Sequence, residues 1–237
     1  MSNLVMKYLL RDLAGGMLLS ILSALPLYAA AGGITLNTTR IIYPQDARQM
    51  SVSVRNTSDK STFLVQSWAE EKNGQKTRDF MVTPPLYTSG PGNENMLRLM
   101  YSGGALPRDR ESLYFFSIKA IPSVDKLALE GKNALILAAV TRVKLFVRPA
   151  GLRLSPDLAP AELRFKKTRQ TLEIHNPTPY FLTVTDIKAG SKKLPDTMVA
   201  PMDRAAIPLP AGSGDDITFS TINDYGAVTP PQKGLMQ

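Results

Sequence analysis

The chain has 237 residues with 43% apolar content, a formal net charge of +8, one histidine and no cysteine. The apolar content excludes an intrinsically disordered chain, and the length allows two domains of about 100 residues each. The lack of cysteine excludes disulfides, thiol catalysis and zinc–thiolate sites, so any domains must be held together by packing alone. We expect no metal and no cofactor.

The positive charge is dispersed along the chain. Basic clusters at 166–169 and 192–193 lie among strand-like segments, where a solvated surface is the ordinary role of such charges. No nucleic-acid-reading motif accompanies them, so we expect no nucleic-acid partner. An acidic partner stays open.

Residues 1–31 have the composition of a secretory signal peptide. Lys7 and Arg11 give a positive start, residues 13–25 are apolar, and small residues then offer cleavage after Ala31. The apolar stretch is too short and too rich in glycine for a membrane span, although an uncleaved anchor is the alternative. We therefore expect export, with no membrane insertion of the mature protein.

Beyond the leader, short β-rich runs recur between turn residues, with almost no helical periodicity. In the run 96–101, for example, Leu97, Leu99 and Tyr101 would point inward and Arg98 outward. Short strands separated by proline and glycine indicate antiparallel sandwiches. In chain order, the expected strands are 49–55, 61–70, 80–83, 96–101, 112–120, 133–147, 161–165, 171–175, 181–189, 192–199, 205–209 and 217–222.

These strands divide into two groups. The segment 148–152, Arg-Pro-Ala-Gly-Leu, has the composition of a boundary between them. We therefore expect an all-β chain with a first domain at 32–150 and a smaller second domain at 151–237.

The most informative window is 134–140, because it is apolar on both faces of a strand. The two faces are Leu135, Leu137 and Ala139 on one side and Ile136, Ala138 and Val140 on the other. In a sandwich only one face of a strand points into the core. A strand buried on both sides, or a short helix, would explain the window. The alternative is an edge strand whose second face serves a partner by strand addition.

Eight stretches spread over almost the whole mature chain form a recognisable series. They are TRIIYP at 39–44, QSW at 66–68, VTPPL at 82–86, DRESL at 109–113, KAIPS at 119–123, RVKLFVRP at 142–149, NPTPY at 176–180 and TINDYG at 221–226. In this order they resemble the periplasmic chaperones of the chaperone–usher pilus pathway, most closely those of the type 1 pilus kind.

The resemblance implies two immunoglobulin-like domains arranged in an L or boomerang, with a client cleft between them. It implies that Arg40 and Lys144 anchor the C-terminal carboxylate of a pilus subunit, since two cations suit a single carboxylate. Leu135, Leu137 and Ala139 would then fill the subunit's open groove by donor-strand complementation.

The resemblance also implies that Glu111, Arg148 and Asp224 join the two domains through a charge network. Such a cluster fixes an angle better than it adds stability. The implied function is to bind, fold and cap pilus subunits and to deliver them to an outer-membrane usher, without enzymatic activity. A self-capping dimer stays open.

Three features depart from the family pattern. Ala139 stands where a larger aliphatic residue is usual, so the client pocket there would be shallow or differently filled. By alternation Lys144 falls on the opposite face from the two leucines, so we expect a bulge or strong twist, or a face assignment shifted by one. The turn at 122–133 is short and has no cysteine, which favours the short-loop branch, whose clients build rod-like pili.

The two alternative classes of protein are a pilus subunit and an enzyme. A pilus subunit would carry a donor extension after its leader, but the alternation of Ile34 and Leu36 soon gives way to polar residues. An enzyme is suggested only by the S-x-x-K spacing of Ser123 and Lys126, which lacks its companion motifs. His175 is the only histidine, which argues against a metal cluster.

Overall fold

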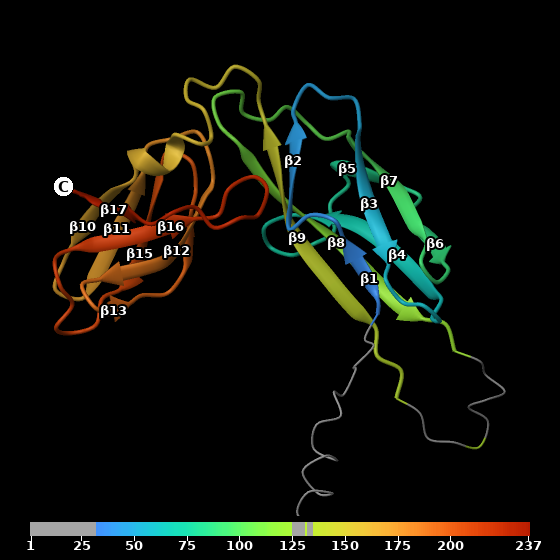
Figure 1. The fold of residues 1–237 in the computed structure, drawn as a ribbon. Coiled ribbons are helices and arrows are strands. Elements are labelled where there is room, and N and C mark those ends of the chain that lie inside the picture. The colour runs from blue at the N-terminus through green and yellow to red at the C-terminus, as the bar shows by residue number, and fades with distance from the viewer. Residues whose placement is uncertain (1–31, 125–130, 132–134) are drawn as a thin grey trace, which may run out of the picture. The chain divides into compact units, whose positions relative to one another are not determined.

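The structure is a computed structural model that describes residues 32–124, 131 and 135–237 (Figure 1). The expected leader, Lys126 of the S-x-x-K spacing and the start of the 134–140 window lie outside the described residues. In the described part, the one helical element is a short 3-10 turn, η1 (Ala159–Glu162), and every other regular element is a strand. This confirms the all-β prediction. No helix in the described ranges has the length and apolar character to cross a membrane.

The first sandwich consists of two sheets around one core. A four-stranded sheet has the order β1-β3-β7-β5, and a five-stranded sheet has the order β2-β9-β8-β4-β6. Their bounds are β1 (Ile34–Leu36), β2 (Arg40–Pro44), β3 (Met50–Asn56), β4 (Phe63–Glu70), β5 (Phe80–Thr83), β6 (Leu86–Ser89), β7 (Glu94–Tyr101), β8 (Ser112–Pro122) and β9 (Ala139–Arg148). In β7, Leu97 and Leu99 are fully buried and Arg98 is exposed, as the alternation predicts.

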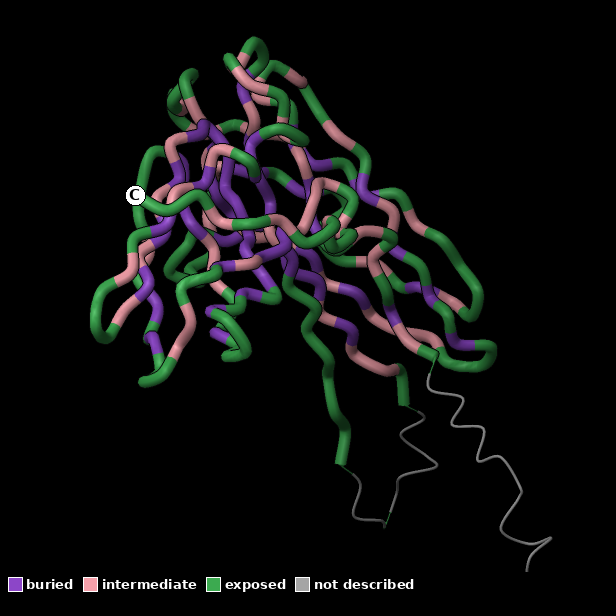
Figure 2. The backbone as a smooth tube through the Cα atoms, turned by 60° about the vertical axis from the view of Figure 1, so that its left-hand side comes forward, coloured by how far each residue is buried: buried purple, intermediate pink, exposed green. Residues whose placement is uncertain are grey.

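The second sandwich has a core of its own. Its sheets have the orders β15-β11-β10-β18 and β13-β12-β16-β17, and β14 also pairs with β12. The bounds are β10 (Arg164–Lys167), β11 (Thr171–Asn176), β12 (Leu182–Ala189), β13 (Lys192–Lys193), β14 (Thr197–Val199), β15 (Asp203–Pro208), β16 (Ile217–Thr221), β17 (Gln232–Lys233) and β18 (Leu235–Met236). Figure 2 shows the buried residues gathered inside the sandwiches, with exposed turns around them.

Three of the expected strands are longer than the strands in the structure. The run 133–147 begins as a strand only at Ala139, and residues 135–138 have no strand partner. The run 192–199 is divided into β13 and β14, and the run 161–165 begins in η1 before β10. Apolar content alone cannot place these ends, because a strand also requires a neighbour that accepts its main-chain hydrogen bonds.

The first strand of the sandwich changes sheets part of the way along. β1 pairs antiparallel with β3 in one sheet, whereas β2 pairs parallel with β9 in the other. The crossing at residues 37–39 means that β2 reaches β9 only from Arg40 onward. This switch determines how much of β9 is covered.

A buried asparagine stabilises a loop in each sandwich. Asn56 ends β3 and Asn176 ends β11, and both side chains are fully buried. Asn56 Nδ2 has three carbonyl oxygens at 2.8–3.2 Å, and Asn176 Nδ2 has three at 2.7–3.2 Å. Each Oδ1 accepts a backbone N–H two residues on, from Ser58 and Thr178, at 3.0 Å. Each sandwich therefore contains the same kind of non-covalent cross-link within itself, in a chain without cysteine.

We predict that Asn176→Ala destabilises the second sandwich by about 2–3 kcal/mol, because buried carbonyl groups lose their donor. Urea unfolding measures this loss. Asn73→Ala, in an exposed turn, is the matched control and should change stability by less than about 0.5 kcal/mol. Equal effects of the two substitutions would contradict the role given to Asn176.

Candidate functional site

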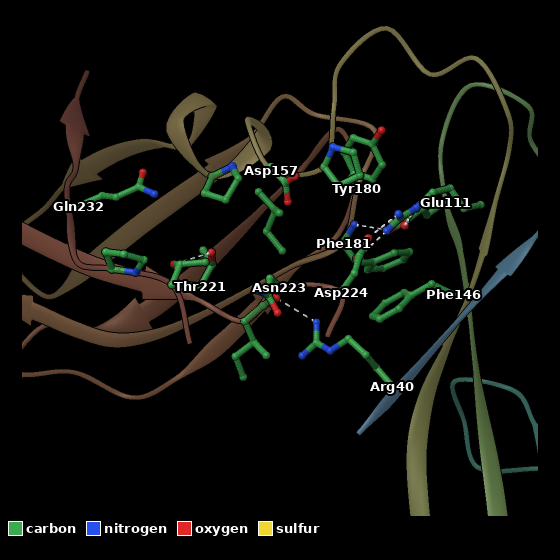
Figure 3. Close-up of a pocket in the computed structure, with 17 residues that line it drawn as sticks. Arg40, Glu111, Phe146, Asp157, Tyr180, Phe181, Thr221, Asn223, Asp224 and Gln232 are labelled. Atoms are coloured by element: carbon green, nitrogen blue, oxygen red, sulfur yellow. Dashed lines mark hydrogen bonds and ion pairs between the residues drawn. The ribbon is translucent and has the colours of Figure 1, made fainter. Parts of the chain in front are cut away.

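The structure places Arg40 and Lys144 side by side. They are direct partners in the parallel ladder between β2 and β9. Arg40 is 7% exposed, and its Nη1 donates to the carbonyl of Ile222 at 3.0 Å. Lys144 Nζ donates to the hydroxyl of Thr183 at 3.0 Å. Both acceptors belong to the second sandwich, and Figure 3 shows Arg40 extending toward it from β2.

These two cations have no carboxylate of their own. No ion pair among the described residues includes Arg40 or Lys144. Burial lowers the pKa of Lys144, and the charge of Arg40 lowers it further. Burial also lowers the pKa of Arg40, with partial compensation from Asp224 and Glu111. Arg40 Nε is buried and has no hydrogen-bond partner among the residues that the structure describes. The pair is therefore suited to an incoming anion.

The three groove-filling candidates all face solvent. Leu135 is 84% exposed and Leu137 is 72% exposed, and Ala139 is exposed at the first position of β9. These side chains do not belong to the core of either sandwich. This excludes the alternative in which the window is a strand buried on both sides, and the absence of any helix at 135–138 excludes the other.

The expected bulge before Lys144 is wrong. The ladder between β8 and β9 runs without a register shift from Ala120↔Ala139 to Ser112↔Val147. Lys144 therefore lies on the opposite face from Ala139, and it reaches Thr183 from that face. The expectation failed because it assumed that the anchor and the apolar residues must use one face of the strand.

One edge of β9 is only partly paired. β8 covers residues 139–147 on one side, whereas β2 covers only 144–148 on the other. Among the residues that the structure describes, no strand pairs with residues 139–143 on the β2 side. Their main-chain groups are available for another strand, and this open edge ends at Arg40.

Glu111, Arg148 and Asp224 form one network. Arg148 Nε donates to Glu111 Oε1 at 2.7 Å, and its Nη1 and Nη2 donate to the two Asp224 oxygens at 2.6 and 2.8 Å. Glu111 Oε2 accepts the backbone N–H of Phe181 at 2.8 Å. Beside the network, Phe146 and Phe181 pack with ring centroids 5.6 Å apart. Residues of the two sandwiches are thus joined by both ionic and apolar contacts.

Burial determines the ionisation of this network. Burial raises the pKa of Glu111, and Arg148 and the Phe181 N–H only partly offset the rise. Burial by itself lowers the pKa of Arg148, but the hydrogen bonds and charges of Asp224 and Glu111 outweigh it and raise that pKa. Arg148 therefore keeps its charge, whereas Glu111 takes up a proton at a higher pH than an ordinary glutamate does.

A cavity of about 220 Å³ lies beside the network. Its walls include Arg40, Phe146, Phe181, Asn223 and Asp224 (Figure 3). Polar and apolar walls are mixed, and the polar walls include Arg40 and all three residues of the ionic network.

Sequence reasoning missed a neighbouring cluster. Arg142 Nε donates to Glu70 Oε2 at 2.6 Å, and the guanidinium lies 3.4 Å from the centroid of the Phe115 ring. Trp68 Nε1 donates to Glu70 Oε1 at 2.7 Å. These partners are on β8 and β4, so Arg142 is drawn away from the open edge of β9. The i, i+2 spacing of Trp68 and Glu70 on one strand face was the available signal.

The contacts of Arg40 and Lys144 were also missed. Their partners are a carbonyl oxygen of Ile222 and the hydroxyl of Thr183, and neither has a distinguishing sequence pattern. His175 lies in β11, and no cluster of metal-ligating side chains occurs in the described part of the chain.

Two family models match the chain. Residues 33–153 match the model described as "Pili and flagellar-assembly chaperone, PapD N-terminal domain", and residues 158–233 match "Pili assembly chaperone PapD, C-terminal domain".

Individual proteins show the same likeness. The chain is 48% identical to the probable fimbrial chaperone SfmC of Escherichia coli K12 over 201 residues, covering 85% of this chain and 87% of that one. It is 46% identical to the chaperone protein FimC of an E. coli O6:H1 strain, covering 88% and 86%. Among solved structures, the periplasmic chaperone SfaE is 43% identical with a TM-score of 0.75, covering 86% of this chain and all of that one. The complex of SafA pilin with the SafB chaperone from Salmonella enterica contains a chain that is 28% identical with a TM-score of 0.78, covering 86% and 96%.

We predict that Arg148→Met destabilises the protein by about 3–5 kcal/mol near neutral pH, because it leaves the buried Glu111 carboxylate without its cation. The pKa of Glu111 in the folded protein is above its ordinary value. The free energy of unfolding therefore falls as pH rises and Glu111 loses its proton. The loss caused by Arg148→Met should therefore shrink in mildly acidic buffer, where Glu111 takes up a proton.

Urea unfolding at the two pH values measures both effects. Arg204→Met is the matched control, since Arg204 forms an exposed ion pair with Glu173 at 3.1 Å and should cost less than about 1 kcal/mol. A loss for Arg148→Met that is independent of pH would show that Glu111 does not respond as described.

Proposed function

This chain belongs to the family of pilus-assembly chaperones, and we propose that it captures pilus subunits by adding a strand to their incomplete sheet. Members of the family are not enzymes, so the prediction that the chain has no enzymatic activity is confirmed. The family assignment also removes the alternative that the chain is itself a pilus subunit. Two immunoglobulin-like sandwiches are the fold of this family, as expected, and their mutual angle stays a prediction.

The observation that carries the proposal is the open edge of β9 that ends at Arg40 and Lys144. A client strand that pairs with residues 139–143 must stop where β2 begins, since β2 occupies the same edge from Arg40 onward. If the client runs parallel to β9, its C-terminus points toward the two cations. An antiparallel client would bring its N-terminus there, and two cations would repel its charged amine. The proposal therefore includes parallel pairing, with the client's carboxylate bound by Arg40 and Lys144.

The apolar face supplies affinity once the carboxylate sets the register. Leu135 and Leu137 lose water when they enter the client's groove, and full burial of each side chain is worth about 1.5–3 kcal/mol. Ala139 adds little, because its side chain is a single methyl group. In this proposal residues 135–138 extend β9 when the client pairs with them.

The remaining parts of the proposal concern location, partners and domains. We propose that residues 1–31 direct export to the periplasm and that loaded complexes pass to an outer-membrane usher. Without a client, two copies could cover each other's open edges as a self-capping dimer. A domain boundary near 150/151 is supported by the two cores, of which one ends at Val147 and the other begins at Ala159.

We predict that Arg40→Ala and Lys144→Met each reduce client capture by more than about tenfold, because a desolvated carboxylate loses a counter-charge. Lys144→Met should leave the chaperone folded, since it removes a repulsion with Arg40. Periplasmic co-expression with candidate pilus subunits, followed by co-purification, measures capture. Lys60→Met, on an exposed loop, is the matched control. Full client yield with either variant would show that the anchor is misassigned.

We predict that Leu137→Glu abolishes the complex with little change in melting temperature, because the side chain is 72% exposed without a client and must be desolvated with one. Ile136→Glu is the matched control, since Ile136 is 48% exposed on the other face. Co-purification and thermal unfolding of the free chaperone give the two readouts. A large fall in melting temperature for Leu137→Glu, or equal loss of capture in both variants, would contradict the face assignment.

A further inference from the structure

We propose that Tyr225 is a further client contact, whose ring packs on the side chain of the client's last residue. This inference rests on the proposed function, because the client's end is located by Arg40 and Lys144. It adds a specificity element beside the charge anchor: a preference for an apolar or aromatic C-terminal residue.

The first observation is that Tyr225 is exposed without being loosely held. It is 90% exposed, the largest fraction among the large apolar side chains that the structure describes as exposed. Its backbone is nevertheless fixed, because Asn223 Oδ1 accepts the N–H groups of Tyr225 and Ala227 at 3.1 and 2.9 Å. Gly226 N–H also donates to the Asn223 carbonyl at 3.0 Å. The turn thus presents a large ring to solvent at a defined place.

The second observation is where this turn lies. Gly226 has a φ of +85°, and a Cβ added there would collide with Thr39 Oγ1, so the turn is in contact with the residue before Arg40. Before the turn in the chain, the carbonyl oxygen of Ile222 accepts a hydrogen bond from Arg40 Nη1 at 3.0 Å, and the Asp224 carboxylate binds Arg148. Tyr225 therefore lies between Asp224, which binds Arg148, and Gly226, which contacts Thr39 just before β2.

The third observation is that Tyr225 does not line the cavity beside the ionic network. Its ring serves neither sandwich's core nor that cavity. A client strand on the open edge of β9 ends next to Thr39 and Arg40, and so it ends next to this turn. A tyrosine ring suits such a contact, because it buries a large area while few rotatable bonds become fixed.

The proposal predicts a selective loss of affinity. The probe is a short synthetic peptide of alternating valine and threonine, fluorescently labelled at its N-terminus and ending in a phenylalanine acid. A second peptide ends in a glycine acid, and a third in a phenylalanine amide. Tyr225→Ala should weaken binding of the phenylalanine acid by about tenfold and that of the glycine acid by less than about twofold. Tyr225→Phe should restore the affinity, since the ring is what packs.

Two controls separate the possible failures. Leu158→Ala removes another exposed apolar side chain, 60% exposed beside η1, and should change neither binding nor melting temperature. Equal weakening of the phenylalanine and glycine peptides by Tyr225→Ala, or no weakening while Arg40→Ala abolishes binding, would overturn the contact and leave the anchor intact. If the unmodified chain binds the acid and the amide alike, the carboxylate anchor itself is wrong, and the Tyr225 contact is overturned with it.

Discussion

The parallel pairing of β2 with β9 stops at Arg40 and Lys144, and the rest of the site depends on that limit. Because β1 pairs in the opposite sheet, β9 keeps an uncovered edge over residues 139–143. Edge strands are normally shielded to prevent unwanted pairing. Here the uncovered edge ends beside the buried Arg40 and the half-buried Lys144. The point where β2 begins therefore limits how far a client strand can extend along β9.

Of the basic side chains on β9, two form ion pairs and one does not among the described residues. Arg142 is paired with Glu70, and Arg148 is paired with Glu111 and Asp224. Lys144 lies between them on the same face, and among the residues that the structure describes its Nζ has only a neutral hydroxyl as partner, with a second cation beside it. The two paired arginines hold the surroundings in place through complete ionic contacts. In the proposed function, Lys144 and Arg40 bind the client's carboxylate, and the fold has already removed part of their water before the client arrives.

Much of the fold could be predicted from alternation and turn residues. The run 96–101 became part of β7 with its faces as expected, because half-buried antiparallel strands carry a clear period of two. The start of β9 could not be predicted, since residues 135–138 are as apolar as a strand but are exposed and pair with no neighbouring strand. The last pair of the ladder with β8, Ala120 and Ala139, decides that boundary, and no local pattern encodes it.

Some features of the site could likewise be predicted and others could not. The adjacency of Arg40 and Lys144 was expected from a family resemblance, because a parallel ladder between distant segments leaves no mark in local spacing. Thr183 and the Ile222 carbonyl were missed, since a hydroxyl and a main-chain oxygen become partners only through tertiary packing. The bulge expected near Lys144 was wrong, because the ladder with β8 keeps one register from Ala139 to Val147 and Lys144 reaches Thr183 from the face opposite Ala139.

That regular alternation along β9 has an evolutionary consequence. In the proposed function, the odd-numbered positions 135–139, at and just before the start of β9, meet the guest. The even-numbered Lys144, Phe146 and Arg148 meet the second sandwich. Substitutions at the odd positions can therefore retune which guests are accepted without disturbing the joint between the sandwiches. Paralogues serving different pili could diverge rapidly at one parity of this ribbon while the other parity stays under structural constraint.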